Sequence, residues 1–180
     1  GYQPSNLAWF DNGRGLTFTS WNSKGHEVYF NDTRFERLNS VGEPVVSPDG
    51  KAVAVVVSRI DRARGTSSYH VLWSGGGDAG PFSQVDTVVF VAGDPVPYFK
   101  AWLIEASPAV LGHGREEVGR YKDVPYLATT PDHCVLVYMT ADDNDSLVLR
   151  VGKRSYGPHY RLGPVAVATN GSRVAYAYAD

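Results

Sequence analysis

One pattern occurs four times along the chain and constrains the fold more than any other feature. Each copy runs from Pro, Gly or Val through a short apolar stretch into a polar turn, then into a longer apolar stretch. Asp-Gly and Asn-Gly turns reverse a chain easily because glycine tolerates positive φ and the Asx side chain bonds its own backbone. Apolar runs on both sides of such a turn predict a β-hairpin. The copies are residues 4–20, 42–58, 124–140 and 163–179.

The spacing of these hairpins indicates a repeat architecture. Their turns lie at Asn12, Asp49, Asp132 and Asn170, and the long middle interval suggests a hidden copy. Residues 80–92 fit that copy, with the turn reduced to Asp86. A third apolar run and a weaker outer segment follow most hairpins. Four antiparallel strands about every 40 residues is the period of propeller blades. The third runs are expected at 26–31, 69–74, 101–106 and 146–151, and the outer segments at 34–38, 117–121 and 156–162.

The expected fold is therefore all-β, a single β-propeller domain over residues 1–180. It has about five short blades of four antiparallel strands, with the last blade incomplete. An unpaired edge favours aggregation, so something should cover the final hairpin. Either the N-terminal segment of the same chain closes the ring, or another copy pairs with it as a homo-oligomer. Closure within one chain is favoured because it avoids the entropy of association. The expected units are 4–40, 41–79, 80–122, 123–162 and 163–180.

The turn Ser-Pro-Asp-Gly at residues 47–50, followed by a long apolar strand, resembles the PD40 repeat, a WD40-like repeat of TolB-type propellers. Residues 130–132 and 169–171 resemble it more weakly. The resemblance implies a propeller fold without implying one activity, because the group includes periplasmic scaffold domains and propeller domains that gate serine peptidases. A secreted or periplasmic location is slightly favoured.

Charge and hydropathy exclude two classes of function. The formal net charge of −2 argues against a protein that binds nucleic acid through a general basic surface. The longest apolar run, residues 52–57, is far shorter than the roughly 20 residues of a membrane-spanning helix. The single cysteine, Cys134, leaves no partner for an intramolecular disulfide.

Candidate ligand residues are expected in the loops between the second and third strands of each blade, at 21–25, 59–68, 93–100 and 141–145. Arginines in the second of these loops suit a carboxylate, sulfate or phosphate, although a solvated hairpin tip is the alternative. Aromatic residues there can stack on sugars or anchor a partner protein, or they can pack between blades. The arginines are Arg59, Arg62 and Arg64, and the aromatic residues are Trp21, Tyr98 and Phe99.

Two further segments carry chemistry. His113 lies in the polar insertion 112–117, where an acid–base pair with Glu116 or Glu117 is the catalytic alternative to a plain surface loop. Clustered oxygen ligands in the segment 142–145 suit Ca²⁺, but their spacing does not match an EF-hand loop, and a solvated acidic turn is the alternative. The candidate metal ligands are Asp142, Asp143 and Asp145. No other cofactor is expected.

Sequence motifs argue against an enzyme. The serine-hydrolase elbow, the P-loop and the dinucleotide fingerprint are absent from the sequence. Glycosidases with five-bladed rings carry carboxylates on inner strands, whereas the inner strands expected here contain no Asp or Glu. These strands are 6–10, 44–47, 82–85, 126–130 and 165–168.

The expected function is a non-catalytic recognition or assembly module that binds a protein or a glycan through its loop face. One alternative is the gating or substrate-recognition propeller of a larger hydrolase. Another is a structural subunit that assembles with other copies through the incomplete blade.

Overall fold

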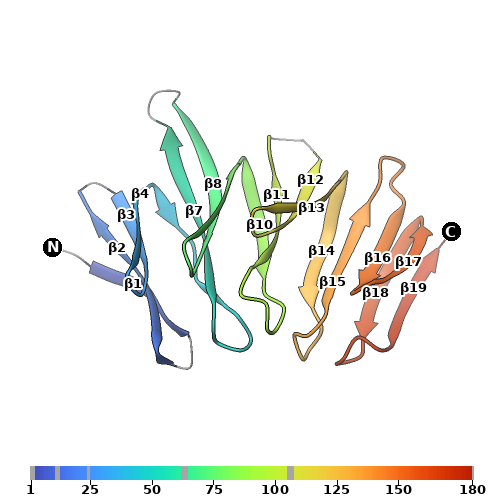
Figure 1. The fold of residues 1–180 in the computed structure, drawn as a ribbon. Helices are drawn as coiled ribbons and strands as arrows, with labels where there is room; N and C mark the ends of the chain where they lie inside the picture. The colour runs from blue at the N-terminus through green and yellow to red at the C-terminus, as the bar shows by residue number, and fades with distance from the viewer. Residues whose placement is uncertain (1–2, 11–12, 24, 62–64, 105–107, 180) are drawn as a thin grey trace.

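The computed structural model describes residues 3–10, 13–23, 25–61, 65–104 and 108–179. These residues form five antiparallel sheets that stand side by side from the N-terminal to the C-terminal end (Figure 1). The expectation of an all-β fold with four-stranded antiparallel sheets is confirmed, and strands follow one another in chain order across each sheet. No helix among the described residues is long and apolar enough to cross a membrane.

The first sheet contains β1 (Gln3–Phe10), β2 (Gly15–Asn22), β3 (Gly25–Phe30) and β4 (Thr33–Leu38). The second contains β5 (Ser40–Val41), β6 (Val45–Val46), β7 (Val53–Asp61), β8 (Thr66–Trp73) and β9 (Gly77–Phe82); β5 and β6 both pair with β7. The third contains β10 (Gln84–Val89), β11 (Tyr98–Trp102), β12 (Ala109–His113) and β13 (Glu116–Tyr121).

The fourth sheet contains β14 (Asp123–Thr129), β15 (Leu136–Ala141), β16 (Leu147–Val151) and β17 (Arg154–His159). The fifth is the hairpin of β18 (Arg161–Val167) and β19 (Val174–Ala179). First strands of adjacent sheets contact each other at two places, β1 with β6 and β10 with β14, while the second and third sheets contact through β8 and β10. Blades around a propeller axis approach one another in the same way.

Antiparallel order divides the connections between two ends of the sheets. We call the lower edge in Figure 1 the turn face: it carries the connections from first to second strand and from third to fourth strand. We call the upper edge the loop face: it carries the connections from second to third strand and the links between sheets. A ligand-binding site can therefore form at either of two separate faces, the turn face or the loop face.

The core consists of four apolar layers, one between each pair of neighbouring sheets. Because the second sheet is covered on both faces, Val53 and Val57 are buried on one side of β7 and Ala54 on the other. This agrees with the run of apolar residues in the sequence. Each layer draws residues from both of its sheets: Val28 and Val55 in the first, Trp73 and Phe99 in the second, Leu111 and Val124 in the third, and Leu149 and Val165 in the fourth.

The expected closure of the ring by the N-terminal segment is wrong for the described residues. The strand β1 pairs with β2, and β19 pairs with β18 alone. The two ends of the chain lie at opposite sides of the row of sheets (Figure 1). Every described residue of the N-terminal segment from Gln3 to Phe10 therefore belongs to the first sheet and not to the final hairpin.

The third unit also differs from the expectation. Asp86 is not a turn residue but lies at a register shift inside β10, and the hairpin partner of β10 begins only at Tyr98. The third strand is β12 rather than residues 101–106, because 101 and 102 belong to β11. The strand β9 was not expected from the sequence. It begins with Gly77, where a side chain cannot fit because a Cβ would overlap the Trp73 ring.

The Ser-Pro-Asp-Gly turn and its weaker copy share one hydrogen-bond arrangement. The Ser47 hydroxyl donates to Asp49 Oδ1 at 2.7 Å and accepts from the Ala52 amide at 2.8 Å. The Thr130 hydroxyl likewise donates to Asp132 at 2.6 Å and accepts from the Val135 amide at 3.1 Å. The hydroxyl hydrogen bond holds the pKa of Asp49 below its ordinary value.

Replacing Ser47 with Ala tests the role of this turn. The substitution leaves the buried Ala52 amide without its acceptor, so we expect the free energy of unfolding to fall by about 1–3 kcal/mol. Urea denaturation at neutral pH measures the change. The control, Ser172→Ala, removes an exposed hydroxyl from the last hairpin and should change stability by less than about 0.5 kcal/mol. Equal midpoints for the wild type and Ser47→Ala would contradict the assignment.

Candidate functional site

A buried lysine near the loop face joins carboxylates from two neighbouring sheets. Lys100 lies on β11, and its side chain is 10% exposed. Its Nζ lies 2.9 Å from Asp123 Oδ1 on β14 and 3.9 Å from Asp86 Oδ2 on β10. The same ammonium lies 4.6 Å from the centre of the Trp102 ring, within cation–π range. We call Asp86, Lys100, Trp102 and Asp123 the Lys100 cluster.

Local backbone features place these side chains. A bulge-like register shift in β10 falls between Val85 and Thr87, which sets Asp86 out of the regular ladder. Asp123 is the first residue of β14, directly after the link from the third sheet, and its Oδ1 also accepts from the Val124 amide at 2.7 Å. The Asp123 carboxylate is therefore held by its own backbone as well as by Lys100.

The carboxylates of the cluster remain open to solvent. Their side chains are 52% exposed at Asp86 and 45% exposed at Asp123, in contrast to the lysine between them. Tyr126, three residues further along β14, is 46% exposed. The arrangement presents hydrogen-bond acceptors on a fixed frame, with an aromatic ring on the same strand.

This cluster corrects the expectation that the inner strands contain no acidic residue. Two first strands, β10 and β14, carry Asp86 and Asp123 near their loop-face ends. The inner strand expected at 82–85 ends one residue before Asp86. The inner strand expected at 126–130 begins three residues after Asp123. Asp86 is flanked by β-branched residues, which favour strands: Val85, Thr87 and Val88. They indicated a strand that extends through Asp86.

The arginines expected to bind an anion are partly engaged within the second sheet. Arg59 lies on β7, and its Nη1 is 2.7 Å from Asp78 Oδ2. His70 Nδ1 lies 2.9 Å from the other oxygen of Asp78. Burial acts to raise the pKa of Asp78, but the hydrogen bonds from His70 and Arg59 outweigh it and lower the pKa. Arg62 and Arg64 lie outside the described residues. Anion binding by the arginines stays a prediction.

The three aromatic candidates do not come together. Trp21 is the second-last residue of β2, near the loop face, and is exposed. Tyr98 and Phe99 are not in a loop: they begin β11 at the turn face, and Phe99 is buried in the core. The expectation that they lie at the loop face is wrong, because the connection before β11 joins the first and second strands of the third sheet.

His113 also lies at the turn face. It ends β12, its Nε2 lies 2.9 Å from Asp94 Oδ2, and its ring stacks on Tyr98 at 4.1 Å between centroids. Glu117 instead accepts from Arg120 on both oxygens, from Nε at Oε1 and from Nη2 at Oε2. The carboxylate that engages His113 is therefore Asp94, not Glu116 or Glu117, which the catalytic alternative had assigned to it.

The acidic segment at the loop face has other partners. Asp142 Oδ1 accepts from the Asn144 and Ser146 amides at 2.9 Å each, and Asp145 pairs with Lys122 at 2.7 Å. Asp143 is exposed. Within the described ranges, no group of three or more His, Cys, Asp or Glu residues is arranged to hold a metal ion. The structure gives the Ca²⁺ hypothesis no support, and it stays a prediction.

Glu27 is a buried carboxylate that its own sheet already satisfies. It accepts from Arg34 and Asn22 at 2.7 Å and from Tyr29 at 2.8 Å, and Ser20 lies at 3.3 Å. Burial acts to raise its pKa, but these hydrogen bonds outweigh burial and lower the pKa from 4.5 to about 2. We therefore assign Glu27 a structural role in the first sheet.

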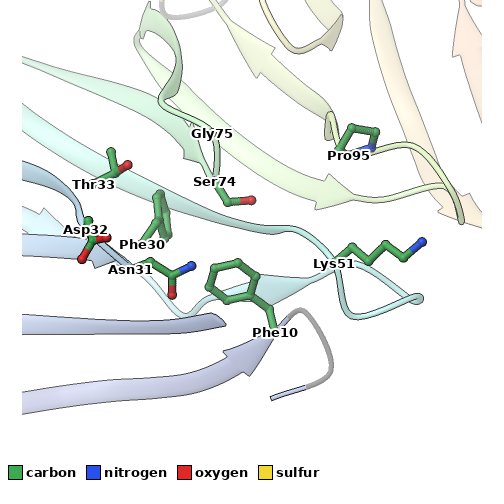
Figure 2. Close-up of a pocket in the computed structure, with 9 residues that line it drawn as sticks. All are labelled: Phe10, Phe30, Asn31, Asp32, Thr33, Lys51, Ser74, Gly75 and Pro95. Carbon is green, nitrogen blue, oxygen red and sulfur yellow. The ribbon is translucent and has the colours of Figure 1, made fainter. Parts of the chain in front are cut away.

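A pocket of about 440 Å³ opens at the turn face, where connections from the first three sheets meet (Figure 2). Phe10 and Phe30 supply apolar rings, and Asn31 and Ser74 lie beside them. The full lining is Phe10, Phe30, Asn31, Asp32, Thr33, Lys51, Ser74, Gly75 and Pro95. Sequence reasoning missed this pocket, because no single repeat contains more than part of it.

Comparison with known proteins finds a loose structural likeness. The chain is similar to the solved structure of dihydro-heme d1 dehydrogenase NirN in complex with DHE, with 14% identity and a TM-score of 0.43. The likeness covers 86% of this chain and 37% of that one. No protein-family model and no curated protein sequence matches the chain. The propeller-type fold rests on the strand order described above, and membership of the PD40 group stays a prediction.

The lowered pKa of Glu27 predicts a pH-dependent contribution to stability. A carboxylate whose pKa falls on folding stabilises the folded state above its unfolded pKa, and this contribution is lost as the pH falls. For Glu27 the loss should span pH 4.5 to about 2. We expect Glu27→Gln to unfold at a lower urea concentration than the wild type at pH 7. The difference between the two midpoints should be smaller at pH 3.

The control for this measurement is Glu43→Gln, which alters an exposed carboxylate in the link to β6. Its difference in urea stability from the wild type should be small and should not shrink from pH 7 to pH 3 as that of Glu27→Gln does. A difference between wild type and Glu27→Gln that stays constant from pH 7 to pH 3 would contradict the assigned role.

Proposed function

We propose that this chain is a non-catalytic, propeller-type recognition module that binds a glycan at the Lys100 cluster. The observation that carries the proposal is the pair of half-exposed carboxylates fixed to one buried lysine, on the first strands of adjacent sheets. These strand ends lie at the loop face, as do the expected ligand loops at 21–25, 59–68 and 141–145.

The chemistry of the cluster suits a ligand rich in hydroxyl groups. Carboxylates accept hydrogen bonds only, and sugar hydroxyls donate them. A hydrogen bond to a charged group contributes about 1.5–3 kcal/mol, more than one between neutral groups. Because Lys100 and the Val124 amide already hold Asp123, little conformational freedom is left for a ligand to remove.

The surroundings of the cluster support the same ligand class. The exposed Tyr126 ring offers an apolar plane with a polar tip, which suits the mixed surface of a sugar ring. The Lys122–Asp145 pair joins the loop of the fourth sheet to the link beside Asp123. A protein partner is the competing occupant, and the hydrolase-gating role stays an alternative prediction.

Glycan-array screening followed by calorimetry tests the proposal. We expect the array to yield a ligand, and Asp86→Asn and Tyr126→Ala each to weaken its affinity, about tenfold or more for the carboxylate. The matched control is Asp143→Asn, an exposed aspartate at the same face outside the cluster, which should bind as the wild type does. An array with no ligand, or equal affinity for wild type and both variants, would contradict glycan binding at this place.

A second candidate function is assembly with another chain, and one observation favours it. On the first sheet, Leu7 and Trp9 are exposed, Trp9 to 60%. Large apolar side chains that lie together on a surface often mark an interface. Light scattering of the 180-residue chain tests this candidate: a mass that grows with concentration supports it, and a constant mass near 19.6 kDa contradicts it.

A further inference from the structure

The turn-face pocket shares no lining residue with the Lys100 cluster. Five connections or strand ends from three sheets form it: the end of β1, the β3–β4 turn, the β6–β7 turn, the β8–β9 turn and the β10–β11 connection. Its volume of about 440 Å³ falls in the range of small-ligand sites. A ligand here would contact the first three sheets at once.

The middle of the pocket combines an apolar floor with two polar groups whose positions are fixed. Phe10 and Phe30 belong to the core layer between the first two sheets, so their rings are held by packing. Asn31 Oδ1 accepts from the Leu16 amide at 2.7 Å, which leaves the side-chain amide nitrogen to donate; in Figure 2 that nitrogen points toward Phe10. Ser74 Oγ accepts from the Val53 amide at 3.2 Å, which leaves its hydroxyl proton to donate.

Opposite charges lie at the two ends of this pocket. Figure 2 shows Asp32 at one end and Lys51 at the other, with Phe10, Phe30 and Ser74 between them. Both side chains are exposed, and neither forms an ion pair within the part of the chain that the structure describes. The Lys51 ammonium does contribute to the lowered pKa of Asp49, after the hydrogen bond from Ser47. Asp49 therefore competes with a ligand for that ammonium.

From this arrangement we infer that the pocket binds a short peptide with free ends and an apolar side chain between them. The peptide ammonium lies at Asp32, its carboxylate lies at Lys51, and its apolar side chain covers the two phenylalanine rings. Peptide carbonyls accept from the Asn31 amide and the Ser74 hydroxyl. Recognition of both ends distinguishes this ligand from a neutral apolar molecule of the same size. The inference does not depend on glycan binding at the Lys100 cluster.

Four forms of one tripeptide test the inference by NMR titration. The probe is alanyl-leucyl-alanine with both ends free, N-acetylated, C-amidated, or blocked at both ends. We expect the free form to bind most tightly to the wild type, and each block to weaken binding about threefold to tenfold, as expected for partly exposed charge pairs. The amide signals that move should belong to the turns at 31–33 and 74–75.

Two substitutions assign each end of the peptide. In Asp32→Asn, acetylation should have no further effect, while amidation should still weaken binding. In Lys51→Gln the pattern should be reversed. The matched controls are Asp143→Asn and Lys153→Gln, both exposed and remote from the pocket lining, and they should behave as the wild type does.

Three results would overturn the inference. The first is absence of binding by the free tripeptide at millimolar concentration. The second is equal binding of the free and doubly blocked forms, which would mean that the ends are not recognised. The third is an unchanged response to acetylation and amidation in both pocket variants, which would place the peptide elsewhere on the protein.

Discussion

The burial of each sheet against its neighbours is the constraint on which the rest of this structure depends. The second, third and fourth sheets are covered on both faces, so a strand such as β7 carries apolar residues on both sides. Stacking of the third and fourth sheets brings their first strands, β10 and β14, into contact. That approach brings Asp86 and Asp123, which belong to different sheets, to the same lysine.

Much of the fold could be predicted from the sequence because its repeats have local causes. The turn at Ser47–Asp49 and its copy at Thr130–Asp132 depend on hydrogen bonds between residues close in the chain. The third sheet could not be predicted as well. Its first hairpin lacks the turn residues that mark the others, and Asp86 resembles a turn residue although it lies at a strand irregularity. A glycine-containing strand such as β9 gives no apolar alternation at all.

The candidate site was predicted less well than the fold, for a physical reason. A contact such as Lys100–Asp123 depends on how two sheets stack, and strand patterns describe each sheet alone. The sequence analysis chose Arg59 and His113 by residue type. In the structure Arg59 is already paired with Asp78 of β9, and His113 with Asp94 of the β10–β11 connection. The turn-face pocket was missed for the same reason, since three sheets contribute to it.

A double-mutant cycle between Lys100 and Asp123 tests most directly whether the third and fourth sheets are joined as described. The proteins are Lys100→Met, Asp123→Asn and the double variant, and urea denaturation gives their free energies of unfolding. Asp123→Asn leaves a buried ammonium with only the more distant Asp86, a costly state that the double variant avoids. The account predicts a coupling energy of about 1–3 kcal/mol, whereas effects that add to within about 0.5 kcal/mol would contradict it.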